Sequence, residues 1–469
     1  MKLKINNVGI IQNSEINISG LTVITGNNNS GKSTVGKVLS SIVSSTINLK
    51  EKAFREKVVY ANNVVLRVSG LLFDNILFRN KRNREYLLFN FPIFGKIMDY
   101  NFLYNSDFTS INELRDFLIE LKKGIERIEY DELLQNVNEK YKKSNTYEVF
   151  KNNKYTCIDM LNNLIEILYH DADLLKYSSK KILDDLNNNF NEQIAPVKYP
   201  KSSIELSLKK NDEIYYDIKI SNGKINENCF FKNPFNHCFL INDVNVLDKL
   251  SQYRGVGRNL YMHRYLVVDD FSDMRYIREN LNDRLLGALT EKLTSFESQT
   301  YAQKYSKYIE YLSNSFSEEI VFVDGKYVCK SNLLDVRNLA TGAKLFAIIK
   351  LLLEKGKVDN QTLIILDEPE NHLHPQWQLE LAKLIVVMVK ELDVKFVITT
   401  HSPSFLLALE TYSKQFDMED ITNYYYSELC DNHYNVKIIN VNLDKERIHY
   451  AINKPFIDIN NLFEEYSEE

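Results

Sequence analysis

The chain has 469 residues, 44% of them apolar, which is enough for two or three domains with a substantial core. Its 58 basic and 63 acidic residues leave a net charge of −5, so no overall attraction to nucleic acid is expected, although a local basic patch stays open. The five cysteines form no C-x-x-C pair and no apolar run is long enough to span a bilayer, which argues against zinc, disulfides and a membrane segment and favours the cytoplasm.

The first elements in chain order are a strand over residues 21–25 and an amphipathic helix over 35–43, joined by a glycine-rich loop. The loop and the helix start fit G-x-x-x-x-G-K-[ST], in which backbone N–H groups and the positive end of the helix dipole surround a phosphate. The nucleotide-binding residues predicted on this basis are Gly26, Asn27, Asn28, Asn29, Ser30, Gly31, Lys32, Ser33 and Thr34. We expect Lys32 to reach the β- and γ-phosphates of ATP, and the Ser33 hydroxyl to bind Mg²⁺.

Apolar periodicity then divides the chain into core and helical segments. In order, these are the N-terminal part of an ATPase core, a helical insertion, a β part of the core, a second helical region and the C-terminal part of the core, expected at residues 1–50, 51–190, 191–245, 246–316 and 317–469. The insertion contains helix-period segments at 111–126 and 157–169. Neither helical segment sustains the heptads of a long coiled-coil arm, so we do not expect a chromosome condensin.

Two hairpins are predicted in the β parts of the chain. Alternating residues at 203–208 and 213–220 predict an antiparallel pair that completes the antiparallel part of the nucleotide-binding lobe. A second hairpin at 320–329 is predicted from Asp324-Gly325, a favoured turn pair. Between the two hairpins, residues 237–241 read as a further strand.

Two clusters of basic residues are candidates for contacts with partners. They contain Arg79, Lys81, Arg82 and Arg84 in the insertion, and Arg254, Arg258 and Arg264 in the second helical region. Such runs are usually solvated surface, and the other interpretation is contact with nucleic acid or an acidic protein. The sequence leaves both interpretations open.

Four apolar residues at 363–366 are followed directly by Asp367, Glu368 and Pro369. A continuous apolar run of this kind is typical of a central parallel strand that is buried on both faces. Ligands bind at the carboxyl ends of such strands, so the two carboxylates should face the nucleotide. We expect Asp367 to support the metal and Glu368 to polarise the attacking water as the general base.

The next predicted strand covers residues 394–400 and ends at His401. Ser402 and Pro403 suit the N-cap and the first position of a helix at 404–410. His401 should therefore lie at a strand tip beside the two carboxylates. A purely structural histidine is the alternative, and we favour a sensor of the γ-phosphate.

The order of these motifs resembles that of the soluble ABC-type ATPases, the group that includes the DNA-repair and chromosome-organising ATPases and the OLD-like defence ATPases. The resemblance is carried by the Walker A loop, a long insertion, the run Asp-Glu-Pro-Glu-Asn-His-Leu-His-Pro from residue 367 and Thr-Thr-His-Ser-Pro from residue 399. It covers about the first 45 residues and about residues 335–410. It implies an α/β fold, an ABC-type P-loop ATPase core with a mixed sheet and flanking helices, into which helical regions are inserted.

In such ATPases two protomers enclose ATP, and a signature segment from one protomer completes the site of the other. By resemblance, Thr341 and Gly342 fall at the signature position and should approach the γ-phosphate held by the partner, which implies a homodimer or higher homo-oligomer. Ala343 and Lys344 depart from the family consensus, which puts the rate of hydrolysis in doubt. The other interpretation is that Thr341 only caps the apolar helix at 345–353.

Two further family segments are placed by the same resemblance. Residues 371–374 fall at the dimer-contacting D-loop. We expect His372 and His374 to contact the interface rather than a metal, because no cysteine or further histidine lies near enough to complete a ligand set. The Q-loop should follow the strand at 237–241, with Asp243 and Gln252 as candidates.

Only 68 residues follow His401 (469 − 401), so a nuclease domain like that of OLD-like proteins is expected on a separate chain. The chain thus resembles the ATPase components of bacterial antiphage systems such as PARIS or Septu, in which a separate protein carries the lethal chemistry. This resemblance implies an ATP-gated sensor or scaffold, a separate effector that is a nuclease or toxin, and a phage-encoded trigger. The alternative is a DNA-repair or DNA-end-binding ABC ATPase, whose basic clusters would contact phosphates.

Overall fold

A computed structural model of the chain describes residues 1–73, 81–98, 108, 110–134, 145–169, 174–196, 201–210, 213–226, 230–251, 281–313, 316–430 and 434–467. These residues form two compact units. Unit 1 consists of Met1–Ile47 and the described residues from Ser178 onward, and unit 2 consists of the described part of Asn48–Tyr177. The described residues of the nucleotide-binding motifs lie in unit 1.

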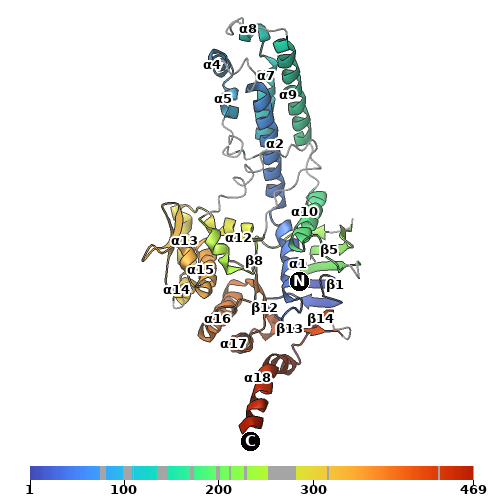
Figure 1. Cartoon of the computed structure of the whole chain (residues 1–469), viewed down its shortest axis with the longest axis vertical. Coiled ribbons are helices and arrows are strands. Elements are labelled where there is room, and N and C mark those ends of the chain that lie inside the picture. The colour runs from blue at the N-terminus through green and yellow to red at the C-terminus, as the bar shows by residue number, and fades with distance from the viewer. Residues whose placement is uncertain are drawn as a thin grey trace. The chain divides into compact units, whose positions relative to one another are not determined.

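The centre of unit 1 is a six-stranded sheet with the order β14-β13-β3-β12-β11-β8 (Figure 1). Its strands are β3 (Leu21–Gly26), β8 (His237–Ile241), β11 (Thr362–Asp367), β12 (Lys395–Thr400), β13 (Thr422–Leu429) and β14 (Val436–Asn440). Five of these strands are parallel, and β14 is antiparallel to its neighbour β13. The strands predicted from the apolar runs are therefore confirmed. Because the carboxyl ends of parallel strands meet at one edge, β3, β11 and β12 bring their motifs together there.

Side chains of β11 alternate between two hydrophobic cores. Ile364 and Leu366 belong to the core that contains the helices following β8, whereas Leu363 and Ile365 belong to the core that contains helix α1 (Lys32–Thr46). None of the four is more than 1% exposed. Burial on both faces is the physical reason for the continuous apolar run of this strand.

The core that contains α1, called the second core below, is closed by an antiparallel sheet. Its strand order is β2-β1-β4-β5-β6, and β7 also pairs with β5. The strands are β1 (Lys2–Asn6), β2 (Ser14–Asn17), β4 (Ser203–Lys210), β5 (Glu213–Ser221), β6 (Lys224–Ile225) and β7 (Phe230–Phe231). β4 and β5 form the hairpin that the alternation predicted, although residues 211–212 of its turn lie outside the described part. Segments about 200 residues apart in the sequence thus complete one sheet, since β1 pairs with β4. Together the two sheets confirm the predicted α/β core with flanking helices.

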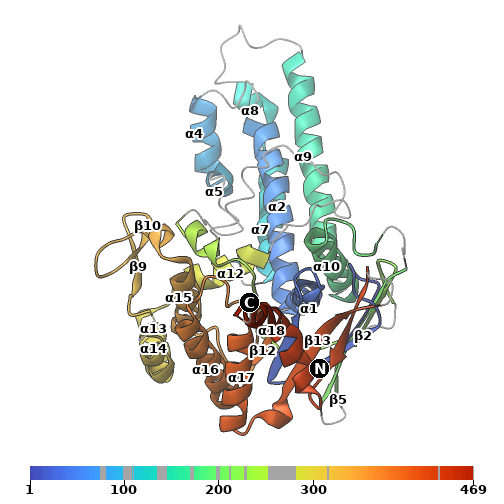
Figure 2. The same ribbon diagram turned by 60° about the horizontal axis from the view of Figure 1, so that its bottom comes forward.

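The first core is covered by helices that follow β8 in the chain. They are η2 (Val244–Lys249), α12 (Leu281–Thr290), α13 (Ser295–Lys304), α14 (Ser306–Ser313), η5 (Val336–Asn338), α15 (Thr341–Glu354), α16 (Pro375–Leu392), α17 (Pro403–Gln415), η6 (Glu419–Ile421) and α18 (Lys445–Ser467). Figure 2 shows α15, α16 and α17 side by side over this face. The hairpin of β9 (Ile320–Val323) and β10 (Lys326–Cys329) precedes α15, and Asp324 and Gly325 turn it with left-handed backbone angles, as predicted.

Unit 2 is helical. It contains α2 (Leu49–Phe73), α4 (Lys81–Asn90), α5 (Ile93–Met98), α7 (Ile111–Glu126), α8 (Tyr130–Leu134) and α9 (Asn145–Tyr169), while α10 (Leu174–Asn189) leads back to unit 1. Its core is built from α2, α5, α7 and α9, with Leu114, Leu118 and Leu121 of α7 fully buried at helical spacing. Ser110 caps α7 by accepting a hydrogen bond from the Glu113 N–H. The helices predicted at 111–126 and 157–169 are confirmed.

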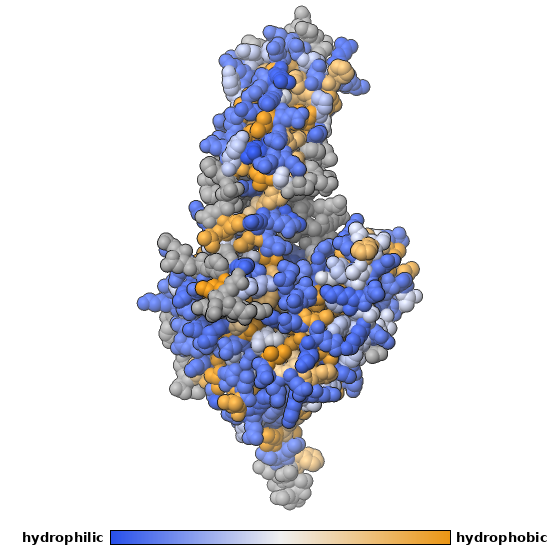
Figure 3. Space-filling view, turned by 180° about the vertical axis from the view of Figure 1, so that it is seen from behind, coloured by the Kyte–Doolittle hydropathy of each residue, from blue (hydrophilic) through white to orange (hydrophobic). Residues whose placement is uncertain are grey.

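The surface of the described residues is mixed in polarity. Hydrophilic residues predominate on the face shown in Figure 3, with hydrophobic residues distributed among them. Within the described ranges, every helix is too short or too polar to span a lipid bilayer.

We expect truncation of Ile365, which is fully buried in β11, to destabilise unit 1. Ile365→Ala should lower the free energy of unfolding by about 2–5 kcal/mol, because burial is lost and a cavity remains, whereas Ile365→Val should cost about 1 kcal/mol. Urea denaturation followed by circular dichroism measures both changes. Equal denaturation midpoints for the two variants would contradict this account of the core.

Candidate nucleotide-binding site

The loop between β3 and α1 has the backbone of a phosphate-binding loop. Gly31 occupies the N-cap of α1 in the left-handed region, with φ of 77°. A Cβ added there would lie 2.9 Å from Cγ1 of Ile11, so no larger residue fits. Asn29 is also left-handed, with φ of 56°, and the side chains of Asn27, Asn28 and Asn29 are exposed. This backbone leaves the loop and the α1 N-terminus open to a phosphate group.

Lys32 opens α1 and points back along the loop. Its Nζ donates hydrogen bonds to the carbonyl oxygens of Gly26 and Asn27, at 3.0 and 2.8 Å. Nζ also lies 3.7 Å from Oε1 of Glu368, and the Lys32 side chain is only 3% exposed. Burial lowers the pKa of Lys32 below its usual value, and the nearby carboxylates, with Glu368 the strongest, oppose that shift. The Lys32 ammonium therefore lies between the backbone of the loop and the carboxylate of Glu368, the predicted general base.

A hydrogen bond between Ser33 and Asp367 joins the first turn of α1 to the carboxyl end of β11. The Ser33 hydroxyl donates a hydrogen bond to Oδ1 of Asp367 at 2.9 Å. The Thr399 hydroxyl donates to the same oxygen at 2.5 Å, because Thr399 on β12 is the register partner of Asp367 on β11. A hydroxyl and a carboxylate oxygen side by side are the donor types that Mg²⁺ takes in proteins. The pair fits the metal-supporting role predicted for these residues, and that role is developed below as a proposal.

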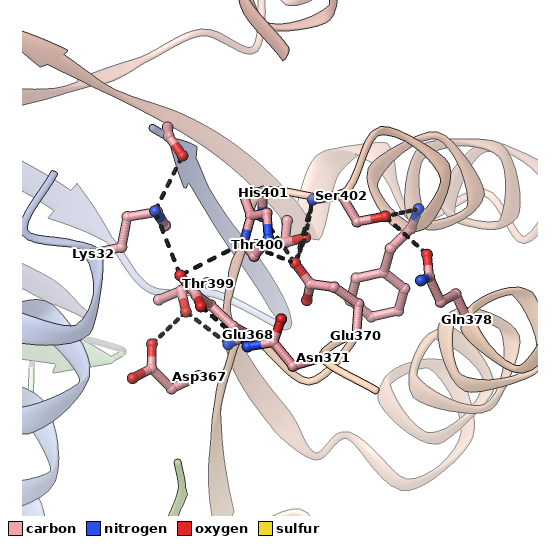
Figure 4. A network of polar contacts seen from close by, with 12 residues as sticks. Lys32, Asp367, Glu368, Glu370, Asn371, Gln378, Thr399, Thr400, His401 and Ser402 are labelled. Carbon is pink, nitrogen blue, oxygen red and sulfur yellow. Dashed lines mark hydrogen bonds and ion pairs between the residues drawn. The ribbon is translucent and has the colours of Figure 1, made fainter. Parts of the chain in front are cut away.

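Glu368 has an unusual backbone that fixes the direction of its side chain. Its φ is 49°, a left-handed conformation for a residue that has a Cβ. The N–H of Glu368 donates to both the carbonyl oxygen and the hydroxyl of Thr399, each at 3.0 Å. Nδ2 of Asn371 donates to Oε2 of Glu368 at 3.2 Å. These bonds hold a strained residue at the end of β11, a feature that clusters at functional sites (Figure 4).

His401 follows β12 and reaches the same carboxylates. Its Nδ1 lies 3.6 Å from Oε1 of Glu368 and 3.6 Å from Oε1 of Glu370. The next residue, Ser402, caps α17 by accepting from the Phe405 N–H at 3.2 Å, so the predicted cap is confirmed. The structure therefore places His401 beside Glu368, and its role as a sensor of the γ-phosphate stays a prediction.

Glu370 is the residue of this site to which no role was assigned from sequence. It lies two residues beyond Glu368, is 5% exposed, and accepts hydrogen bonds from residues 400–402. Burial raises the pKa of Glu370 above its usual range, and the hydrogen bonds it accepts from Thr400 and the His401 N–H oppose the shift. Only its position in the Asp-Glu-Pro-Glu run could have signalled a role, because its burial depends on the packing of α16 and α17.

The signature segment lies at the N-terminus of α15. Thr341 is the first helical residue, and the N-cap is Ala340, which makes no side-chain capping bond. The interpretation of Thr341 as the helix cap is therefore wrong, because Thr341 is itself the first residue of the helix and Ala340 occupies the N-cap position. A Cβ on Gly342 would lie 2.9 Å from the carbonyl oxygen of His372 and 3.0 Å from Cδ2 of Leu373. Gly342 thus allows α15 to pack closely on the segment between β11 and α16.

Neither signature residue takes part in the site of its own chain. Among the described residues, the hydrogen bonds and ion pairs around Lys32, Asp367 and Glu368 include neither Thr341 nor Gly342. Their role towards a nucleotide on a second protomer stays a prediction.

Lys344, which departs from the family consensus, has a structural role in this chain. Its Nζ lies 2.7 Å from Oδ1 of Asp248 and donates to Oδ1 of Asn245 at 3.2 Å. The Lys344 side chain is 5% exposed and that of Asp248 is 31% exposed. The ion pair ties the signature helix to η2, the short helix that follows β8.

The remaining predicted residues have mixed outcomes. Asp243 caps η2 by accepting from the Asn245 N–H at 2.9 Å, while Gln252 lies outside the described residues. His374 caps α16 through Nδ1, which accepts from the Gln376 N–H at 3.3 Å. His372 is exposed and left-handed, with φ of 66°. Of the basic clusters, Lys81, Arg82 and Arg84 lie on α4 of unit 2, whereas Arg79, Arg254, Arg258 and Arg264 lie outside the described residues.

Comparison with known families agrees with this geometry. Residues 1–406 match the profile of a family described as AAA ATPase domain, a range that runs from the first strand of the core to beyond His401. The chain belongs to this ATPase family. The matched range includes the phosphate-binding loop, both candidate carboxylates and the predicted signature segment. Together with the fold, it confirms the expected α/β core of a P-loop ATPase.

A curated protein and several solved structures are similar to this chain. Septu protein PtuA of Bacillus thuringiensis is 21% identical over 287 residues, which are 59% of this chain and 64% of the relative. The match therefore spans less than two thirds of that relative's length. Among solved structures, an Smc head bound to the C-terminal winged-helix domain of ScpA is similar over 95% of this chain and 98% of that chain, with a TM-score of 0.37 and 11% identity. The SMC head domain from Thermotoga maritima covers 94% and 98%, with a TM-score of 0.35 and 9% identity.

We expect the loss of Asp248 to destabilise unit 1 more than the loss of its ion-pair partner Lys344 does. Asp248→Ala leaves a buried ammonium without its carboxylate and should lower the free energy of unfolding by about 3 kcal/mol. Lys344→Met leaves a carboxylate that is 31% exposed and can be hydrated, so the loss should be smaller. Chemical denaturation of both variants and of the double variant measures the difference. A loss for Lys344→Met as large as that for Asp248→Ala would contradict this explanation.

Proposed function

We propose that this chain is a Mg²⁺-dependent ATPase that works as an ATP-gated sensor or scaffold in antiphage defence and controls a separate effector. The observation that carries the enzymatic part is the direct contact of Ser33 with Asp367, with Lys32 and Glu368 3.7 Å apart beside it. Residues 334 positions apart in the sequence thereby form one site (367 − 33). The family match supports an ATPase domain of this kind.

The proposed roles follow from where each group lies. The loop N–H groups and Lys32 bind the phosphates of ATP, and Ser33 and Asp367 hold Mg²⁺. When bound, Mg²⁺ neutralises charge on the β- and γ-phosphates. Glu368 orients the attacking water and accepts its proton, and the left-handed backbone directs this carboxylate towards Lys32. His401, next to Glu368, contacts the γ-phosphate.

The proposed assembly is a homodimer that can extend to a higher oligomer. Ala340 makes no side-chain bond to the first turn of α15, and Thr341 at the start of that turn is partly exposed, so this helix end is proposed to meet an anion held by another protomer. Thr341 and Gly342 then complete the site of the partner. Binding of ATP would favour the closed dimer and hydrolysis would release it, so ligands that alter the docking would shift the populations.

The defence role rests on a different support. The similarity to Septu protein PtuA links this chain to a relative from an antiphage system, at 21% identity and over part of that relative's length. In the Septu type of system a separate nuclease or toxin carries the lethal chemistry, so a second gene product is the proposed effector. A phage-encoded molecule would be the trigger.

The role of Glu368 predicts a separation of ATP binding from hydrolysis. Glu368→Gln should lower kcat at least about 10²-fold, because the general base is lost, while the dissociation constant for ATP stays within about threefold. A coupled phosphate-release assay and equilibrium nucleotide binding measure the two quantities. Glu446→Gln, at an exposed position on α18, is the matched control and should behave as wild type. Turnover at the wild-type rate in Glu368→Gln would show that the assignment is wrong.

The defence role predicts a partner that depends on the nucleotide. Purification of the Glu368→Gln protein from its native operon with ATP and Mg²⁺ should yield a large complex that contains a second gene product, measured by light scattering and mass spectrometry. Lys32→Ala should lose this complex and, in cells, resistance to phage. A lone dimer that retains DNA in a salt-sensitive manner would instead favour a DNA-repair ATPase.

A further inference from the structure

A buried carboxylate organises the turn that carries His401. Glu370 lies between β11 and α16 and is 5% exposed. Its Oε1 accepts three hydrogen bonds, from the Thr400 hydroxyl at 2.6 Å, the His401 N–H at 2.9 Å and the Ser402 N–H at 3.3 Å. A carboxylate is seldom buried without such partners, because its desolvation is otherwise costly. The donors are the last residue of β12 and the two residues that link this strand to α17, so Glu370 determines the path of that link (Figure 4).

The other side of the link is fixed as well. The Ser402 hydroxyl donates to Oε1 of Gln378 on α16 at 2.8 Å, and the Ser404 hydroxyl donates to the same oxygen at 2.7 Å. Glu370 therefore holds residues 400–402, and Gln378 holds Ser402 and Ser404, so the link is bonded at both of its ends. The backbone N–H of His401 itself is bonded to Glu370, so little freedom is left for its Cα position.

The imidazole of His401 lies between two carboxylates of different character. Nδ1 is 3.6 Å from Oε1 of Glu368 and 3.6 Å from Oε1 of Glu370. Glu368 is 28% exposed on its side chain, whereas the Glu370 side chain is 3% exposed. The exposed carboxylate is free to meet water and nucleotide, and the buried one holds the backbone. The two glutamates of the Asp-Glu-Pro-Glu run thus have separate tasks.

We infer that Glu370 is a positioning residue that holds His401 beside Glu368, and that it serves the hydrolysis step rather than the binding of ATP. This inference rests on the proposed ATPase function. Glu370 acts through the Thr400 hydroxyl and the backbone N–H groups of His401 and Ser402. Among the described residues, the hydrogen bonds and ion pairs of Lys32, Ser33 and Asp367 do not include its carboxylate. This role needs an acceptor oxygen at the position of Oε1, and the amide oxygen of glutamine can accept hydrogen bonds from the same three donors.

The test compares four variants of the full chain by steady-state ATPase kinetics and ATP affinity. Glu370→Ala should lower kcat about tenfold to a hundredfold and leave KM and the dissociation constant for ATP within about twofold, because a displaced catalytic group affects the chemical step. Glu370→Gln should keep kcat within about threefold of wild type. The Glu370→Ala, His401→Ala double variant should be no slower than His401→Ala alone, because both changes remove one function.

Other outcomes would overturn the inference. Additive losses in the double variant, or a loss of ATP affinity in Glu370→Ala, would show that Glu370 does not act through His401. Equal losses for Glu370→Gln and Glu370→Ala would show that the acceptor oxygen is not what matters. If Glu370→Ala fails to fold, Glu370→Asp replaces it, since withdrawal by one methylene should slow turnover below that of Glu370→Gln, and equal rates would overturn the inference.

The same measurements separate this inference from the proposed function. A wild-type protein without ATPase activity, or full activity in Glu368→Gln, contradicts the proposed function whatever the Glu370 variants do. Loss of turnover in Glu368→Gln together with wild-type behaviour of Glu370→Ala leaves the ATPase role intact and removes only the role of Glu370.

Discussion

The hydrogen bonds that Asp367 accepts from Ser33 and Thr399 are the contact on which the rest of the site depends. Thr399 reaches Asp367 only because β11 and β12 are parallel and in register, and Ser33 reaches it because α1 starts at the end of β3, the next strand beyond β12. A shift of one residue in the β11–β12 register would turn the Thr399 hydroxyl to the other face of the sheet. Such a shift would also exchange the β11 side chains between the two hydrophobic cores, since Ile364 and Leu366 pack in one core and Leu363 and Ile365 pack in the other.

The polar side chains around this contact differ in how far they are exposed to solvent. Lys32 and Glu370 are almost fully buried and are held by backbone carbonyl or N–H groups, whereas Glu368 and His401 remain partly exposed. Buried charges must be paired or hydrogen-bonded, so the buried members cannot move far. The exposed members sit on that fixed frame and are the ones that can meet water and nucleotide. The proposed roles thus divide positioning and chemistry between neighbouring residues.

The signature helix α15 is attached to the core by two contacts that differ in kind. Gly342 allows close packing against the backbone of His372, and Lys344 forms a buried ion pair with Asp248 on η2. The first contact joins α15 to the segment that follows Glu368, and the second joins it to the segment that follows β8. The N-terminal part of α15 is therefore in direct contact with the segments that follow two strand ends. The departure from the family consensus at Lys344 has a physical reason in this chain.

The sequence by itself determined the phosphate-binding loop, the apolar strands and the residues at their ends, since a glycine-rich turn and a buried parallel strand leave local patterns. It also located both hairpins, because alternation and a turn pair such as Asp324-Gly325 are local too. Only the tertiary structure decided that Glu370 is buried, that Lys344 pairs with Asp248, and that Ala340 rather than Thr341 is the N-cap. Burial and long-range pairing depend on which elements pack together, and no local pattern encodes that for a single carboxylate or lysine.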